Sequence, residues 1–140
     1  MDTWIIYAII SMIFAGLTSI LAKYGLANIN PDFGLGIRTT VIFLIITVIN
    51  IIGTKYKDFG LITQKQWILL IASGITTTVS WIFYYRAMKE GLVSYVAAID
   101  KASIVITLLL SFLLLKEPFT PKIIVGAGLI FIGMLILVWK

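Results

Sequence analysis

The sequence contains no cysteine and no histidine, and only 12% of its 140 residues are charged. Without cysteine there are no disulfides and no thiol chemistry. Without histidine the commonest metal ligand and every histidine-based catalytic triad are excluded. We therefore expect neither a metal site nor a cofactor. Acidic residues number 6 against 11 lysines and arginines, so the formal net charge is +5.

Hydrophobic residues make up 61% of the chain, which is more than a soluble domain of this size can bury. The composition therefore indicates an integral membrane protein. The positive charge does not point to nucleic acid, because the lysines and arginines lie at the ends of apolar runs, as in loops that flank membrane spans. The N-terminus has no basic region, and the first apolar run is too long for a signal peptide. We expect it to remain as a span of a multi-pass cell-membrane protein.

Five apolar segments predict five transmembrane helices in one domain, residues 1–140, with an all-α fold. The predicted spans are residues 4–25, 33–52, 67–88, 93–115 and 122–139. The longest polar connection, Thr54–Gln66, lies between the second and third spans. Because every connection is short, neighbouring spans should be antiparallel.

The loop charges give little bias to the orientation of the chain. The face that holds the N-terminus carries five lysines, and the opposite face carries five lysines and arginines: Lys55, Lys57, Lys65, Lys116 and Lys122 against Lys23, Arg38, Arg86, Lys89 and Lys140. The positive-inside rule depends on an imbalance. Two interpretations stay open: insertion in both orientations, giving an inverted pair of copies, or a single orientation set by other features.

The fourth span carries Asp100 and Lys101 well inside its first half. The 14 residues from Ala102 to Leu115 make about 21 Å of helix, against about 30 Å of hydrocarbon, so a full span places both charges inside the membrane. A bent or re-entrant segment at residues 93–99 is the alternative. Side chains of consecutive residues point about 100° apart on a helix, so we expect each charge to find its partner elsewhere.

Polar and small residues recur at helical spacing in three spans. The stripes are Asp100, Ser103, Thr107 and Ser111; Ser73, Thr77, Ser80 and Tyr84; and Met12, Gly16, Ser19 and Lys23. Such stripes are usually packing surfaces between helices, but one that contains an intramembrane carboxylate favours a central polar cavity. The fifth span has only small residues among its apolar ones, so we expect a peripheral packing or dimer element.

Lys23, Arg38 and Arg86 share a half of the membrane with Asp100, and they suggest a cation-rich vestibule. For Lys23 and Arg86 we favour the simpler interpretation that they reach toward the lipid headgroups. Trp81 lies two-thirds of the way along the third span, as a cavity wall or as bulk that faces lipid. An enzyme is not expected, because residues two apart, such as Lys101 and Ser103, point away from each other and no other catalytic set is present.

These features resemble the EamA-like domain of the drug/metabolite transporter superfamily over nearly the whole chain. The resemblance rests on the aromatic run Ser80–Met88 with Gly91, on Val96–Lys101, on Lys116-Glu117, on the pair Gly126 and Gly133, and on Arg38. Ala98 stands where the family usually has proline, so the helix should run straighter past Asp100.

The resemblance implies a small-metabolite exporter or permease that works by alternating access. Such proteins usually hold two of these domains in inverted orientation, so this chain would be half of a ten-helix inverted-repeat carrier. Its partner would be a second copy in antiparallel orientation or a small paralogous subunit. One alternative is a non-transporting membrane subunit or assembly factor. Another is a lipid-headgroup flippase subunit.

The predicted site combines charges with aromatic and hydroxyl side chains. Asp100 is the expected coupling group or ligand of a substrate ammonium, and Lys101 and Arg38 would bind anionic groups. The expected wall and polar path are Trp81, Tyr84, Tyr85, Ser103 and Thr107.

Overall fold

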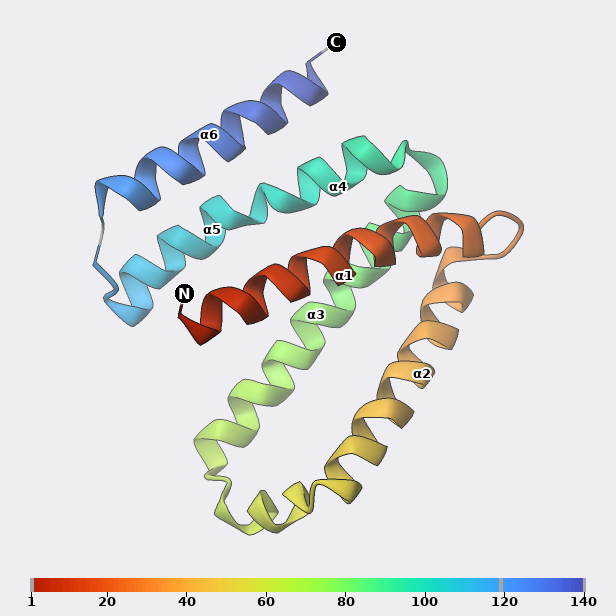
Figure 1. Ribbon diagram of the computed structural model, residues 1–140. Coiled ribbons are helices and arrows are strands. Elements are labelled where there is room, and N and C mark those ends of the chain that lie inside the picture. Colours follow the sequence, from red (N-terminus) through yellow and green to blue (C-terminus); the bar gives the residue numbers. More distant parts are fainter. Residues whose placement is uncertain (1, 119, 140) are drawn as a thin grey trace. The chain divides into compact units, whose positions relative to one another are not determined.

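The computed structural model describes residues 2–118 and 120–139, and every regular element in this part of the chain is helical (Figure 1). In chain order the elements are α1 (Thr3–Gly25), α2 (Pro31–Ile52), the 3₁₀ helix η1 (Lys55–Leu61), α3 (Gln64–Glu90), α4 (Val93–Lys101), α5 (Ser103–Leu110), the π-helical turn η2 (Ser111–Leu115) and α6 (Pro121–Val138). Among the described residues, five segments are long and apolar enough to cross a membrane, with α4, α5 and η2 forming one of them. The predicted five-span all-α fold is confirmed.

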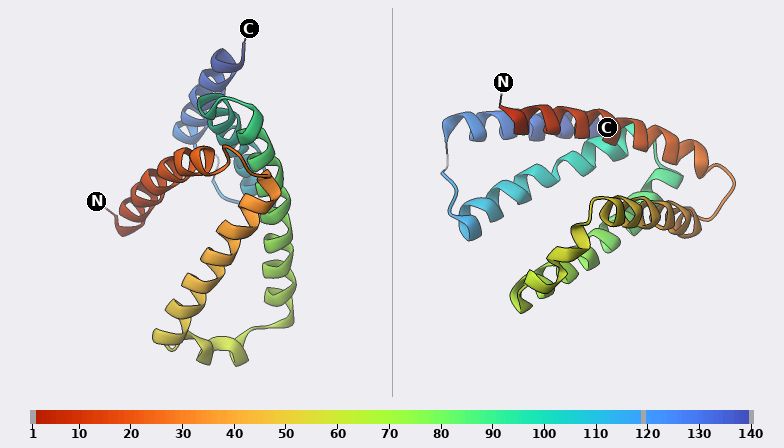
Figure 2. Two further views of the ribbon diagram at one scale, coloured as in Figure 1. Left: turned by 90° about the vertical axis from the view of Figure 1, so that its right-hand side faces the viewer. Right: turned by 60° about the horizontal axis from the view of Figure 1, so that its bottom comes forward.

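The chain divides into two compact units, Leu21–Lys89 and Met1–Ile20 with Glu90–Lys140. In the first unit α2 and α3 come together near their Pro31 and Glu90 ends and diverge toward η1 (Figure 2). The buried hydrophobic residues of this unit gather where the helices meet, with exposed fractions from 0% to 7%: Leu26, Leu35, Tyr85 and Met88. These side chains hold the last turn of α1 and the ends of α2 and α3 together.

The start of α2 follows from its local sequence. Pro31 occupies the first turn, where its missing N–H is not needed, and the Asn30 side chain caps the helix. Asn30 Oδ1 accepts hydrogen bonds from the backbone N–H groups of Asp32 at 2.8 Å and Phe33 at 3.4 Å. A Cβ atom at Gly34 would lie 2.6 Å from Leu26 Cδ2, so a glycine there allows Leu26 to pack against the helix.

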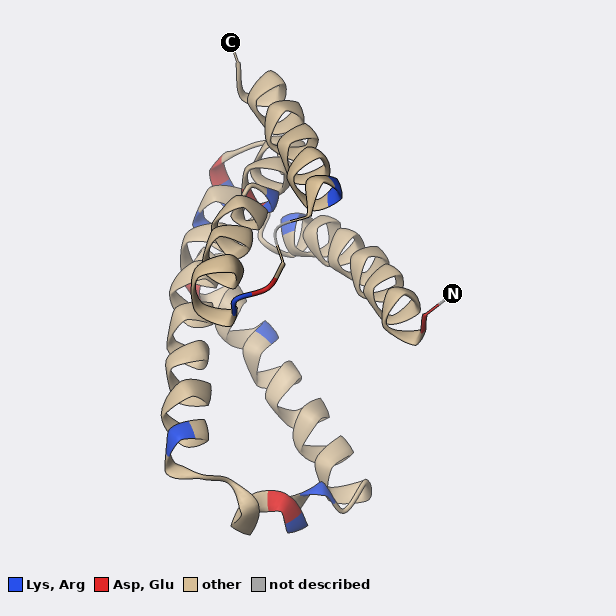
Figure 3. Ribbon diagram, turned by 90° about the vertical axis from the view of Figure 1, so that its left-hand side faces the viewer, with Lys and Arg blue, Asp and Glu red and all other residues tan. Residues whose placement is uncertain are grey.

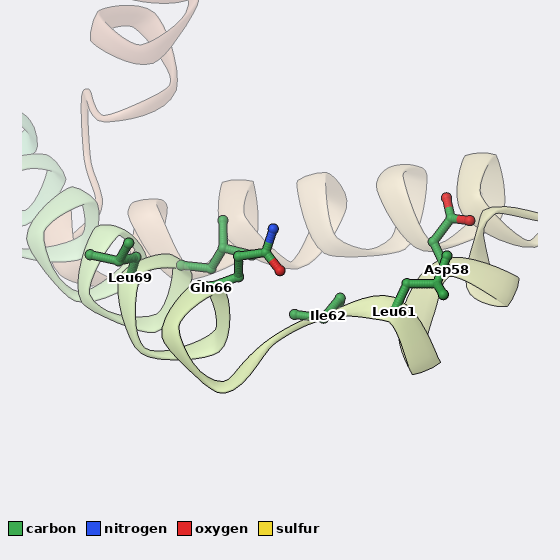
Figure 4. Close-up of a pocket in the computed structure, with 6 residues that line it drawn as sticks. Asp58, Leu61, Ile62, Gln66 and Leu69 are labelled. Carbon is green, nitrogen blue, oxygen red and sulfur yellow. The ribbon is translucent and has the colours of Figure 1, made fainter. Parts of the chain in front are cut away.

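The polar connection between α2 and α3 is more ordered than a simple loop. It contains η1, and α3 begins with a capping box in which the Gln66 side chain accepts from Thr63 N and Gln66 N donates to Thr63 Oγ1. A cavity of about 460 Å³ lies beside this cap, lined by Asp58, Gln66 and apolar side chains (Figure 4). It includes none of the predicted site residues.

In the unit Met1–Ile20 with Glu90–Lys140, α6 runs beside α4 and α5 (Figure 1). Pro121 opens α6, as expected for a proline at a first helical turn. Ala127 is the single buried hydrophobic residue of this unit within the described ranges. Because most apolar side chains are exposed, they must face lipid or further protein.

The fourth span is irregular at two places. Ala102 N donates to Ile99 O at 3.0 Å, three residues back rather than four, and this tighter turn separates α4 from α5. At Ala98, where the family usually has proline, α4 continues without a break, and the interruption comes four residues later at Ala102. Proline does not cause the interruption, because no proline lies within Val93–Leu115. At the other end η2 stops at Lys116, whose φ is 56°, and the Ser111 hydroxyl donates to the Glu117 carboxylate.

Candidate functional site

Most charged residues lie near helix ends and in the connections (Figure 3). Inside the unit Leu21–Lys89, one of them makes a different kind of contact. The Arg38 guanidinium carbon lies 4.2 Å from the centre of the Trp81 ring and 5.7 Å from that of Tyr85. Tyr84 lies beside Tyr85, with ring centres 6.5 Å apart. The structure therefore brings together four predicted site residues, and Trp81 lies against a cation rather than only facing lipid.

The aromatic contacts do not fully stabilise Arg38. A cation over aromatic rings gains about 0.5–2 kcal/mol. An arginine at the centre of a membrane helix costs about 2.5–3.5 kcal/mol on insertion scales. Arg38 lies seven residues after Pro31, roughly 10 Å along the helix, so it is inside the span but not at its centre. The ring contacts use none of its N–H donors, which remain open to water or an anion.

Two lysines at this end cap each other's helices. Lys23 Nζ donates to the carbonyls of Met88 at 2.7 Å and Lys89 at 3.3 Å, at the end of α3. In return, Lys89 Nζ donates to the carbonyls of Leu26 at 2.5 Å and Ala27 at 2.7 Å, just past the end of α1. Carbonyls at a helix C-terminus lack intrahelical partners and carry partial negative charge. The two ammonium groups therefore join the helix ends.

Arg86 also has a partner within the protein. Its Nη2 lies 2.7 Å from Asp32 Oδ2, and its Nε donates to Asp32 Oδ1 at 3.0 Å, so the pair is bidentate. The interpretation that Lys23 and Arg86 only reach for headgroups is wrong, because Lys23 donates to carbonyls at the end of α3 and Arg86 pairs with Asp32 in the first turn of α2. Sequence reasoning missed Asp32 as a partner, although its place in the first turn of α2 puts it on the same membrane face as Arg86.

Asp100 and Lys101 pair with each other in the other unit. Lys101 Nζ lies 3.1 Å from Asp100 Oδ2, and the two side chains are 66% and 37% exposed, respectively. The expectation that neighbouring residues cannot face each other is wrong here, because the long lysine side chain folds back across the 100° between them. Ser103 and Thr107 follow on α5 and are both exposed.

A groove of about 700 Å³ runs between α1 and α4 within this unit. Its lining combines small and hydroxyl side chains with one charge: Ser11, Met12, Gly16, Ser19, Ser94 and Lys101. Three of the four stripe residues predicted in the first span therefore line the groove. Lys101 also lines the groove, although it lies outside the stripe of polar residues that begins at Asp100. A second, apolar groove of about 290 Å³ separates α5 from α6.

The two clusters belong to different units, so each stands on its own contacts. Neither offers a metal centre among the described residues, where no group of three acidic, histidine or cysteine side chains gathers. Chemically, one unit offers a guanidinium packed against aromatic rings, and the other offers an ion pair beside a mainly apolar groove that contains three serines. Both lie within helices that are apolar enough to cross a membrane.

These features define a multi-pass membrane protein with charges inside its spans. The chain belongs to the EamA-like transporter family, whose model matches residues 2–139. A five-helix chain of this family fits one half of an inverted-repeat transporter. Membership also points to a transporter rather than an enzyme.

Two relatives match over almost their entire length. The chain is 37% identical over 136 residues to a Sinorhizobium protein named an uncharacterized transporter in cobO 3'region, covering 97% of this chain and 96% of the relative. It is 31% identical over 137 residues to an uncharacterized protein of Methanocaldococcus jannaschii, covering 98% and 97%. No solved structure matches the chain.

Proposed function

We propose that this chain is half of a carrier that moves a small metabolite across the cell membrane by alternating access. The observation that carries the proposal is the fourth span, where an ion pair lies one residue before a helix interruption and one of its members lines a mainly apolar groove that also contains three serines. In secondary transporters, discontinuous helices near the middle of the membrane hold substrate and coupling ions. Membership of the EamA-like transporter family supports the same function.

In this proposal Asp100 exchanges a proton or binds a substrate ammonium. Lys101 competes with the proton or the ammonium for the Asp100 carboxylate. When Lys101, which lines the groove, turns away from Asp100, the Asp100 carboxylate becomes available to the substrate. Ser103 and Thr107 continue the polar face along α5. Arg38 receives anionic groups, and Trp81, Tyr84 and Tyr85 form the wall around it.

Uptake into proteoliposomes tests the coupling. The protein is reconstituted and assayed with a panel of labelled amino acids and small organic acids at several pH values. We expect Asp100→Asn to lose the pH dependence, because the amide cannot exchange the proton. Asp58→Asn is the matched control, since Asp58 lies in the connection between α2 and α3. Transport by Asp100→Asn with an unchanged pH dependence would remove the coupling role.

The carrier requires a second half, which we propose is another copy in antiparallel orientation or a small paralogous subunit. Variants with opposite loop charge test the first arrangement: Lys55→Ser with Lys57→Ser, and Gly60→Lys with Gln64→Lys. The two double variants should insert in opposite orientations, because one removes positive charge from this loop and the other adds it. Each alone should lose transport, and co-expression of the two should restore transport. If reporters at both termini place each terminus on one side only in the unmodified protein, the antiparallel homodimer is excluded.

A non-transporting subunit is the second candidate, favoured by the direct Asp100–Lys101 contact. In that case the pair only stabilises the helix. Exchanging the two residues (Asp100→Lys with Lys101→Asp) then preserves function. In a carrier the exchange moves the carboxylate into the groove and should abolish transport.

A further inference from the structure

The Leu21–Lys89 unit gathers four cationic side chains at the end where its helices meet, and three of them are occupied by oxygen atoms. Lys23 and Lys89 donate to backbone carbonyls, and Arg86 donates to Asp32. Arg38 differs. Within residues 2–118 and 120–139 its guanidinium has aromatic neighbours only, with no hydrogen bond and no carboxylate within 4.0 Å.

The ring contacts leave the hydrogen-bonding capacity of Arg38 unused. A guanidinium has five N–H donors in a planar fork, and a cation–π contact consumes none of them. No buried side-chain nitrogen among the described residues lacks a partner, so the unbonded nitrogens of Arg38 are accessible. The side chain is nevertheless half-buried, against the half-buried Trp81 and the buried Tyr85. The aromatic side chains therefore restrict its orientation while its donors stay available.

The engagement of the neighbouring cations limits what this fork can bind. Lys23 and Lys89 keep their positive charges, but their ammonium groups are hydrogen-bonded to backbone carbonyls, and Arg86 is paired with Asp32. Among the described cations at this end, Arg38 therefore offers the open donors, and a carboxylate matches the spacing of its fork through two parallel hydrogen bonds. Moving a doubly charged phosphate from water into a half-buried position costs more than moving a singly charged carboxylate, so the fork favours the carboxylate.

We propose that Arg38, supported by Trp81 and Tyr85, is a binding site for one carboxylate group of a small ligand. This inference rests on the proposed transport function only in making the transported substrate a carboxylate-bearing molecule. The binding site itself requires no transport. The carboxylate can come from a soluble acid or from the serine headgroup of a lipid, and the experiment distinguishes the two sources.

The test uses the full chain in phosphatidylcholine nanodiscs, with Trp4, Trp67 and Trp139 replaced by phenylalanine so that Trp81 alone reports. We expect sodium acetate to change Trp81 fluorescence saturably, because a bound anion alters the cation over the ring. Sodium phosphate and methylammonium chloride at equal ionic strength should give no saturable change. A saturable response to phosphate equal to that to acetate would overturn the proposal, as would no response to acetate.

Variants locate the response at Arg38. Arg38→Lys keeps the charge but loses the fork and should weaken acetate binding at least about tenfold, and Arg38→Gln should abolish it. Arg86→Lys is the matched control, an arginine of the same unit already paired with Asp32, and should bind acetate within about twofold of the parent protein. Unchanged binding in Arg38→Gln would overturn the site. If that variant does not fold, the preference for acetate over phosphate in the parent protein decides.

Two further arms separate the sources and the two proposals. Phosphatidylserine in the nanodisc should compete with acetate if a lipid supplies the carboxylate, and leave acetate binding unchanged if a soluble acid does. Competition by phosphatidylglycerol, which offers only a phosphate, would contradict the site. Acetate binding without uptake of any acid removes the transport function and keeps the site. Acid uptake that survives Arg38→Gln keeps the transport function and removes the carboxylate site at Arg38.

Discussion

The two units use their charges in opposite ways. In Leu21–Lys89, charged side chains connect residues that are more than fifty positions apart, such as Arg86 with Asp32 and Lys23 with Met88. In the other unit, Asp100 pairs with the next residue, and that contact joins no two helices. The first arrangement stabilises a fold. The second leaves both charges available to something else.

The unit Leu21–Lys89 also holds more of the buried hydrophobic side chains than the other unit. Of the five buried hydrophobic residues within 2–118 and 120–139, four belong to Leu21–Lys89 and one, Ala127, belongs to the other unit. We infer that the helix ends near Leu26 and Met88 form the stable part of this chain. We propose that a substrate or a second subunit completes the other part, which holds the α1–α4 groove and the interrupted fourth span.

The largest effect should come from two methionines that differ in burial. Met88 is 0% exposed and Met12 is 65% exposed. Met88→Ala leaves a cavity in the packed end and should reduce the free energy of unfolding by about 2–5 kcal/mol. Met12→Ala should change it by less than about 0.5 kcal/mol. Unfolding in detergent measures both, and equal losses would contradict the difference between the units.

The second effect concerns the reciprocal lysine caps. Lys23→Met with Lys89→Met keeps most of the side-chain volume but leaves four carbonyls without an ammonium partner. We expect a loss of about 1.5–3 kcal/mol of unfolding free energy, in line with charge-assisted hydrogen bonds. Asp100→Asn with Lys101→Met is the control and should leave thermal stability unchanged, because the two residues pair with each other and their contact joins no two helices. A destabilised control would show that both units use their lysines for stability.

The sequence predicts the five spans because each is a predominantly apolar run bounded by turn residues and charges, even where Arg38 or the pair Asp100 and Lys101 lies inside it. It does not predict the partners of Lys23 and Lys89, since a backbone carbonyl carries no signal in the side-chain pattern. The interruption at Ala102 lies in a stretch without proline or glycine, so no local residue marks it. For Asp100 and Lys101, the angle between consecutive side chains was a poor guide because it ignores the reach of lysine.

The candidate site is predictable to a similar degree. The cation–π contact of Arg38 joins residues that the sequence singles out separately, an arginine inside one span and an aromatic run in the next. Their meeting depends on how α2 and α3 converge, which no pattern within either helix specifies. Asp32 is not predicted as a partner of Arg86, because its position in the turn before α2 already accounts for an aspartate there. In the structure it also forms the ion pair with Arg86.

The smallest effect on stability, and the sharpest on function, should come from exchanging the members of each ion pair. Asp32→Arg with Arg86→Asp keeps a contact between α2 and α3, so thermal stability and transport should both stay close to those of the parent protein. Asp100→Lys with Lys101→Asp also keeps an ion pair and should leave thermal stability unchanged. It should nevertheless abolish uptake, because the carboxylate then stands where Lys101 lined the groove. Melting curves and proteoliposome uptake measure the two outcomes separately. If uptake were lost in the Asp32–Arg86 exchange and kept in the Asp100–Lys101 exchange, the assignment of structural and functional charges would have to be reversed.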